Sequence, residues 1–265
     1  MEWLLAYLLL GACVGLFAGL FGVGGGLMLV PVLLFLFDAQ HFAPEHLLHL
    51  ALGTSMATII FTSLASLRKH HQYGAVNWLV VRHITPGILF GTALGSLLAT
   101  SMAPHFLGIF FALFVYFAAA QILLNVKPHA ARQLPNGLGF TLMGTFTGWI
   151  SSLVSIGGGT VVIPFLFWCN VPLRNAIGTS AAIGFPVAVG GTLGYILTGL
   201  SNDTLPPNSL GFVYLPALLW VAFASVITAP FGAKATHHMK IGLLRKLFAV
   251  LLIALATKML WKILS

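Results

Sequence analysis

The chain has 265 residues, of which 59% are hydrophobic and only 6% are charged, with four Asp or Glu against twelve Lys or Arg. Soluble domains carry roughly a quarter charged residues, so this composition excludes a water-soluble globular protein and indicates an integral membrane protein. The net charge of +8 does not require a nucleic-acid partner, and we expect none, because basic residues in cytoplasmic loops produce the same excess.

Eight apolar stretches follow one another along the chain, each near the ~20 residues that a helix needs to cross a bilayer. The first and the fifth are interrupted by glycines. In chain order the stretches are Trp3–Phe37, Leu47–Leu67, Val76–Ala99, His105–Leu124, Leu138–Trp168, Leu173–Leu197, Gly211–Phe231 and Ile241–Leu264. The sequence therefore predicts an all-α, polytopic helical membrane protein, with one transmembrane domain over residues 1–265 that membrane lipids surround.

The two interrupted stretches repeat one unusual sequence. Gly15–Phe35 reads GLFAGLFGVGGGLMLVPVLLF, and Gly148–Trp168, 133 positions later, reads GWISSLVSIGGGTVVIPFLFW. A similar heptapeptide follows each, ALGTSMA in the first half and AIGTSAA in the second. Two halves with a glycine-interrupted apolar segment in matching places are typical of secondary transporters. We predict one repeat over about residues 1–125 and a second over about 136–265.

The charged residues favour one topology. If every stretch crossed once, Arg174 and Lys240 of the second half would lie outside, against the positive-inside rule. If the interrupted stretches instead enter and return on one side, each half has three crossings and the halves are inverted. With the N-terminus outside, ten of the twelve basic residues then lie inside, all but Lys258 and Lys262, and all four acidic residues lie outside. The charges therefore favour inverted repeats, each with one re-entrant segment and three transmembrane helices.

The glycine triplets are the candidate substrate site. Each glycine costs a helix roughly 1 kcal/mol against alanine, and non-helical backbone in a membrane is tolerated only in protein or beside a wet cavity. Backbone N–H groups freed at the start of a new helix can bind an anion, and nearby GTS hydroxyls add donors. The alternative is close helix packing by small residues, and the matched pair favours binding. The candidates are Gly24, Gly25, Gly26, Thr54 and Ser55, and Gly157, Gly158, Gly159, Thr179 and Ser180.

Other chemistry finds little support in the sequence. No Asp or Glu lies within a predicted span, so a buried carboxylate relay is not available, and we expect no catalytic residue and no cofactor. Glu45, His46 and His49 are close enough in sequence for a surface metal site, but a metal site needs several convergent ligands and loop or interface histidines are the more common case, so we expect no metal. His83 is the one histidine that we consider for proton coupling.

These residues resemble the TauE/SafE family of sulfite and sulfonate transporters. The resemblance rests on the GxGGG–P element at Gly22–Pro31 and its copy at Ser155–Pro164, on the GTS triplets and on the polar stretch Arg68–Trp78, and it covers essentially the whole chain. It implies transport of sulfite, sulfoacetate or another organosulfonate across a bacterial inner membrane. The alternatives are a carrier for another small anion or metabolite and, from another class, a histidine-based metal carrier or a membrane-embedded enzyme.

Overall fold

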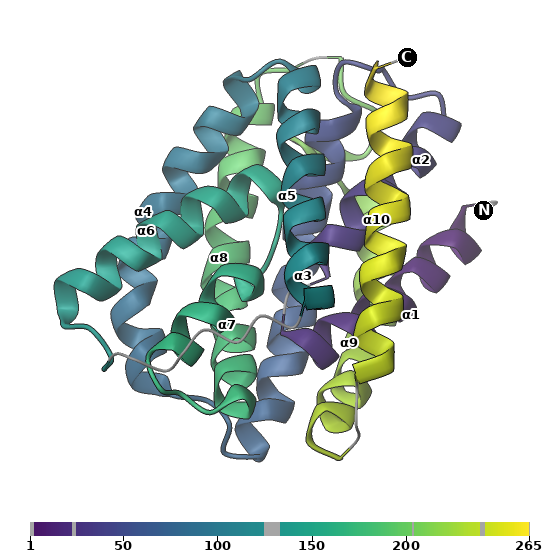
Figure 1. Ribbon diagram of the computed structural model, residues 1–265. Helices are drawn as coiled ribbons and strands as arrows, with labels where there is room; N and C mark the ends of the chain where they lie inside the picture. The colour runs from purple at the N-terminus through teal and green to yellow at the C-terminus, as the bar shows by residue number, and fades with distance from the viewer. Residues whose placement is uncertain (1–2, 23–24, 125–132, 203, 239–241, 265) are drawn as a thin grey trace.

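The computed structural model describes residues 3–22, 25–124, 133–202, 204–238 and 242–264, which form ten α-helices and one β-hairpin (Figure 1). The helices of the first half are α1 Leu4–Phe21, α2 Gly26–Ala39, α3 Leu47–Gln72, α4 Trp78–Ser101 and α5 Pro104–Leu124. Those of the second half are α6 Gly137–Val154, α7 Gly159–Trp168, α8 Leu173–Gly199, α9 Leu215–His238 and α10 Gly242–Leu264. Between α8 and α9 lies the hairpin of β1 Ser209–Leu210 and β2 Val213–Tyr214.

Six helices, α1, α3, α4, α5, α8 and α9, are long and apolar enough to cross a membrane, whereas α2 and α7 are shorter apolar helices. The outer faces of the long helices carry exposed large apolar side chains, including Leu9, Phe90, Phe117 and Phe231. Such a surface suits a lipid solvent, and the backbone groups beneath it are satisfied within the helices. The protein is therefore a multi-pass integral membrane protein, as its composition predicts.

The first interrupted stretch is a helical hairpin. Gln40, which caps the end of α2, donates from Nε2 to the hydroxyl of Tyr7 in the first turn of α1 at 2.7 Å. The far ends of the two helices are therefore adjacent, and the glycines between them form the tip. This is the shape of a segment that enters and returns on one side, which the charge pattern favours over a single crossing.

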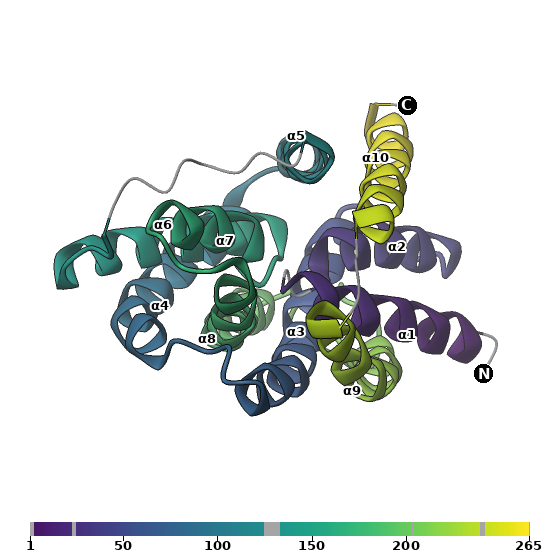
Figure 2. The same cartoon turned by 60° about the horizontal axis from the view of Figure 1, so that its bottom comes forward.

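The two halves exchange partners. Helix α1 packs along α9 of the other half, and α6 packs along α4, while α3 and α8 lie together at the centre (Figure 2). Glycines make these contacts close: side chains on Gly15 of α1 or Gly91 of α4 would overlap the backbone of the partner helix. Small residues at the contact are common where transmembrane helices pack closely against each other.

Equivalent helices of the two halves run in opposite directions. Along α3, the residues Gly53, Met56 and Ser63 face Tyr195, Gly191 and Gly184 of α8 in descending order. In the same way, Tyr116 of α5 is 2.7 Å from Thr257 of α10, and α10 ends at the top of Figure 1, where α5 begins. The fold therefore has the inverted halves that the sequence predicts, each with one glycine-broken segment and three further helices.

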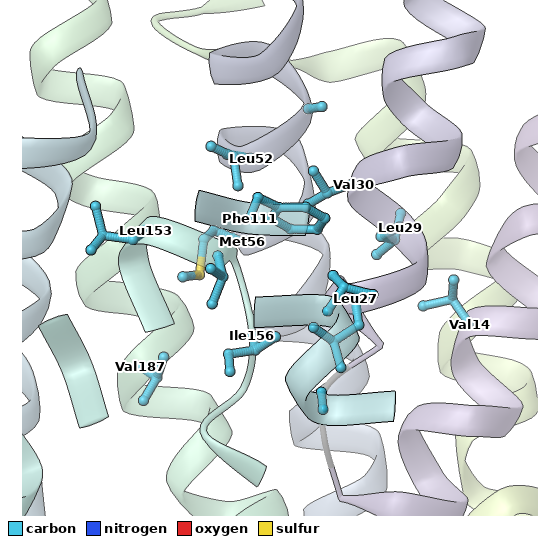
Figure 3. Close-up of a cluster of buried hydrophobic side chains, with 14 of the residues drawn as sticks. Val14, Leu27, Leu29, Val30, Leu52, Met56, Phe111, Leu153, Ile156 and Val187 are labelled. Atoms are coloured by element: carbon cyan, nitrogen blue, oxygen red, sulfur yellow. The ribbon is translucent and has the colours of Figure 1, made fainter. Parts of the chain in front are cut away.

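The hydrophobic core lies where the halves meet (Figure 3). Leu27 of α2, Leu52 and Met56 of α3, and Phe111 of α5 belong to it, together with Ile156 from the break between α6 and α7. All five side chains are almost completely buried. Both glycine breaks are thus enclosed by side chains from both halves rather than exposed to lipid.

The charged residues gather at the two ends of the bundle. One end carries Arg68, Lys69, Arg82, Arg174, Lys234, Arg245 and Lys246, at the ends of the helices that meet there. The opposite end carries Asp38 and Glu45 together with two basic residues, Lys258 and Lys262. Lys262 forms an ion pair with Asp38, and the Lys258 Nζ lies 4.8 Å from the ring centre of Phe35. The other charged residues, Glu2, Lys127, Arg132, Asp203 and Lys240, lie outside the described residues.

We expect the end with the acidic residues, and with it both termini, to face away from the cytoplasm, because the basic residues gather at the other end. In a chain without its two native cysteines, Ser201→Cys should react with a membrane-impermeant maleimide on intact cells, and Gln72→Cys should react only after the membrane is opened. Both residues are exposed in turns or helix ends. The opposite pattern of labelling would show that the orientation is wrong.

Candidate functional site

Both breaks have the same backbone shape. Helix α1 ends at Gly22 with φ 66°, and α2 begins after Gly25 with φ 80°. Helix α6 ends at Ser155 with φ 49°, and α7 begins after Gly158 with φ 81°. The left-handed conformation costs a non-glycine residue roughly 1–2 kcal/mol. At Ser155 the hydroxyl donates to the Leu52 carbonyl of α3 at 2.9 Å, which offsets part of that cost.

The two breaks touch each other at the centre of the molecule. A Cβ on Gly26 would overlap the carbonyl oxygen of Ser155, so the start of α2 lies directly on the end of α6. The same Cβ would lie 3.2 Å from Ile59 of α3. Glycine is therefore required at Gly26 by this approach of two backbones. Of the candidate residues, Gly24 lies outside the described part of the chain.

Matching side chains hold the ends of the broken helices. His70 of α3 lies with Nε2 3.3 Å from the Gly19 carbonyl near the end of α1. Tyr195, at the equivalent position of α8, donates its hydroxyl to the Ser152 carbonyl near the end of α6 at 2.8 Å. Each central helix thus satisfies a carbonyl that its broken neighbour cannot use within its own last turn.

The two GTS threonines have structural partners. Thr54 Oγ1 accepts from the backbone N–H of Tyr214 at 2.9 Å, and Thr179 Oγ1 accepts from that of Asn77 at 2.9 Å. These bonds hold the segments that precede α9 and α4. A threonine hydroxyl that accepts can still donate its own proton, so both remain available to an anion.

The two GTS serines differ from each other. Ser180 donates to the Gly22 carbonyl at 3.1 Å and so anchors the first break on α8. Ser55 is fully buried and has no hydrogen-bond partner within the described residues. It lies on α3 between Leu52 and Ile59, on the face that contacts the joined breaks. The structure therefore separates two serines that the sequence treats as equivalent.

Three further hydroxyls lie beside the second break and are absent from the sequence-based candidates. Thr147, Ser151 and Thr160 are buried, and none has a hydrogen-bond partner among the residues described. Their counterparts 133 positions earlier are Val14, Ala18 and Leu27. A comparison of the repeats position by position, for differences rather than identities, would have found them.

A small cavity lies beside the breaks. Its lining comes from the end of α1, from three hydroxyl residues of α3 and from α8: Ala18, Gly22, Thr62, Ser63, Ser66, Ala181 and Gly184. Its free volume of about 10 Å³ is near what one water molecule needs. A Cβ on Gly184 would lie 3.3 Å from the Gly157 carbonyl and 3.4 Å from Ser63, so the cavity adjoins the second triplet.

Comparison with known proteins decides the family. The family model for the sulfite exporter TauE/SafE matches residues 7–259. The chain belongs to the TauE/SafE family. A relative from Haemophilus influenzae, named "Probable membrane transporter protein", is 35% identical over 262 residues, which cover 98% of this chain and 99% of the relative. No solved structure matches the chain.

More distant relatives carry similar names. A "Probable membrane transporter protein" of Methanocaldococcus jannaschii is 27% identical and covers 88% of this chain and 86% of its own length. The protein YdhB of Bacillus subtilis, with the same description, is 27% identical over 85% of this chain and 87% of its own length. This TauE/SafE protein is therefore a membrane transporter, and the sequence-based interpretation of the family and of transport is confirmed.

Matching positions at the two ends of this transporter carry different side chains. At the acidic end Phe212 donates its N–H to the Tyr195 carbonyl at 3.2 Å, and its ring centre lies 5.2 Å from that of His49. At the basic end the equivalent residue is Ala75, whose N–H donates to the His70 carbonyl at 3.1 Å. The matching position thus carries a large aromatic ring at the acidic end and a methyl group at the basic end.

The histidines considered for a metal or a proton lie apart from the breaks. His46 lies 3.6 Å from Glu45, but His49 turns to the Ala99 carbonyl at 3.1 Å. Among the described residues, no three His, Cys, Asp or Glu side chains are placed to hold one metal ion. His83 is exposed near the start of α4, with Nδ1 2.7 Å from the Leu79 carbonyl of the same helix.

Proposed function

We propose that this TauE/SafE transporter carries a small sulfur-containing anion, sulfite or an organosulfonate such as sulfoacetate, across the inner membrane. The observation that carries the proposal is the contact of two glycine breaks at the centre, with a helix starting inside the protein at each. In α2 the hydrogen-bond ladder begins with Met28 and Leu29, which donate to Gly25. In α7 it begins with Val161 and Val162, which donate to Gly158.

The N–H groups that precede these ladders point out of the helix starts, where the helix dipole is positive. Sulfite and organosulfonates share a head of three sulfur-bound oxygens that carries negative charge. Several convergent neutral donors suit such a head, and the proposed donors are the triplets Gly24–Gly26 and Gly157–Gly159 with Thr54, Ser55, Thr179 and Ser180. The described Lys and Arg residues lie toward helix ends, so none of them would hold the anion at the centre and slow its release.

Inverted halves give such a site two routes of access. When one half rocks against the other, a central site can open first to one side and then to the other. The unequal surroundings of the breaks, with the small cavity at Ser63 and Ser66 on one side and Phe212 against His49 at the acidic end, are compatible with such alternation.

A thermal-shift screen tests the substrate class. Purified protein is heated with sulfite, sulfoacetate, taurine, thiosulfate, sulfate or chloride at equal ionic strength. A ligand that binds only the folded state at 100 times its Kd stabilises by about 2.7 kcal/mol. We expect sulfite or a sulfonate to raise the melting temperature and chloride to leave it unchanged. A shift with other anions only would favour the alternative carrier, and no shift with any sulfur oxyanion would contradict the proposal.

The two GTS serines should give different effects on alanine substitution. Ser55→Ala removes an unpaired donor, so apparent affinity should fall about two- to tenfold without loss of stability, as expected for one neutral hydrogen bond. Ser180→Ala also removes the bond to Gly22, so the free energy of unfolding should fall by about 0.5–1.5 kcal/mol as well. Transport kinetics and melting curves check both. Unchanged affinity in the double variant would exclude the serines from the site.

A further inference from the structure

The second break is lined by hydroxyls that the fold leaves unpaired. Thr147 and Ser151 are one turn apart on α6 and have no exposed surface, and Thr160 in the first turn of α7 is only 7% exposed. None of the three has a hydrogen-bond partner in the part of the chain described here. Buried polar side chains in native proteins are nearly always hydrogen-bonded, so three such hydroxyls at one place point to a partner outside the described residues, such as a bound ligand.

Two of these three side chains lie at the glycine turn. A Cβ on Gly158 would lie 3.2 Å from the methyl group of Thr147, which places this side chain directly beside the start of α7. Thr160 follows Gly158 by two residues, within the helix start itself. The turn therefore combines free backbone N–H groups with unpaired hydroxyl donors.

The first break has the same backbone shape, but its own helices carry apolar side chains at the three matching positions. Val14 takes the place of Thr147 and lies against Gly25 in the same way, with Cγ1 2.5 Å from the position of a Cβ there. Ala18 and Leu27 take the places of Ser151 and Thr160. The two breaks thus share their backbone shape, but only the second has hydroxyl donors at these three positions.

We propose that the anion site is asymmetric. The oxyanion binds within the second break, at the start of α7, where Thr147, Ser151 and Thr160 donate hydrogen bonds to its oxygens. The matching positions of the first break, Val14, Ala18 and Leu27, carry no hydroxyl. This inference rests on the proposed function: it places the oxyanion on the second triplet, leaves the first triplet a structural part in the contact between the breaks, and adds three ligands. The small cavity is lined by Gly22 of the first break and adjoins the second break at Gly184, where a Cβ would lie 3.3 Å from the Gly157 carbonyl.

The test is the affinity of wild type and three variants, Thr147→Val, Ser151→Ala and Thr160→Val, for sulfite, measured by titration calorimetry in detergent. Hydrogen bonds to a charged group are roughly twice as strong as neutral ones, so each variant should bind sulfite about tenfold or more weakly. Without ligand, the melting temperature should stay equal or rise, since each change removes a buried hydroxyl with no partner. Hydroxyls with a purely structural role would lower the melting temperature and leave affinity unchanged.

Thr192→Val is the matched control. Thr192 is also 7% exposed and without a partner among the described residues, but it lies on α8. We expect its sulfite affinity to equal that of wild type. If wild type binds sulfite and the three variants bind it equally well, the asymmetric site is wrong while the proposed function stands. If wild type binds neither sulfite nor sulfoacetate, the proposed function and the inference both fail.

Discussion

Gly26→Ala should abolish transport, with a loss of at least about 100-fold, which corresponds to about 2.7 kcal/mol. The added methyl group would overlap the Ser155 carbonyl, a backbone atom that cannot move without moving the end of α6. The two breaks would separate, and the donors of the proposed site would no longer converge. Uptake into proteoliposomes measures the loss, and size-exclusion chromatography shows whether the variant remains a dispersed, folded protein.

Gly137→Ala is the control for Gly26→Ala. Gly137 is also the first residue of a helix, but no atom lies within 4 Å of a Cβ placed on it. The Gly137→Ala variant should transport normally, because the added methyl group meets no other atom and alanine is a better helix former than glycine. Normal transport by Gly26→Ala would show that the contact between the breaks is not needed.

Gly158→Leu should also abolish transport while the protein remains inserted in the membrane, and Gly25→Leu should do the same. Both glycines have φ near 80°, where a side chain costs roughly 1–2 kcal/mol. The larger effect is steric: leucine at Gly158 would fill the space beside Thr147 where the anion is proposed to bind, and leucine at Gly25 would overlap Val14. Transport rates at equal amounts of inserted protein provide the measurement.

Gly74→Leu controls for the strain alone. Gly74 has φ 63° in the exposed turn after α3, and nothing lies within 4 Å of a Cβ there. It carries a similar backbone cost without entering the proposed site, so we expect transport close to wild type. Equal loss in Gly74→Leu and Gly158→Leu would assign the effect to strain, and the triplets would not be the site.

Much of this fold could be predicted from the sequence because each half of the chain repeats the same order of helices and glycine breaks. The match at an offset of 133 locates both breaks, and the charges predict the inverted arrangement. The exchange of partners between halves could not be predicted, because Gly15 and Gly91 show that close neighbours exist but not which helices they are. The offset also changes along the chain: α2 has 14 residues and α7 only 10, and the connection after α7 is shorter as well, so equivalent residues of α3 and α8 are 125 apart.

The sequence predicts part of the geometry of the candidate site. The left-handed turns at Gly25 and Gly158 follow from the glycine triplets. The differing partners of Ser55 and Ser180 do not, because they depend on which backbone atom of the other half lies opposite each hydroxyl. The identities between the repeats do not indicate Thr147, because its counterpart in the first half is Val14.

Uptake of radiolabelled sulfite by proteoliposomes tests the central claim most directly. We predict that liposomes with wild-type protein take up the label faster than protein-free liposomes and that unlabelled sulfoacetate competes with it. Liposomes with Gly158→Leu should take up the label only at the protein-free rate. Equal rates of uptake with wild type, with Gly158→Leu and without protein would contradict it.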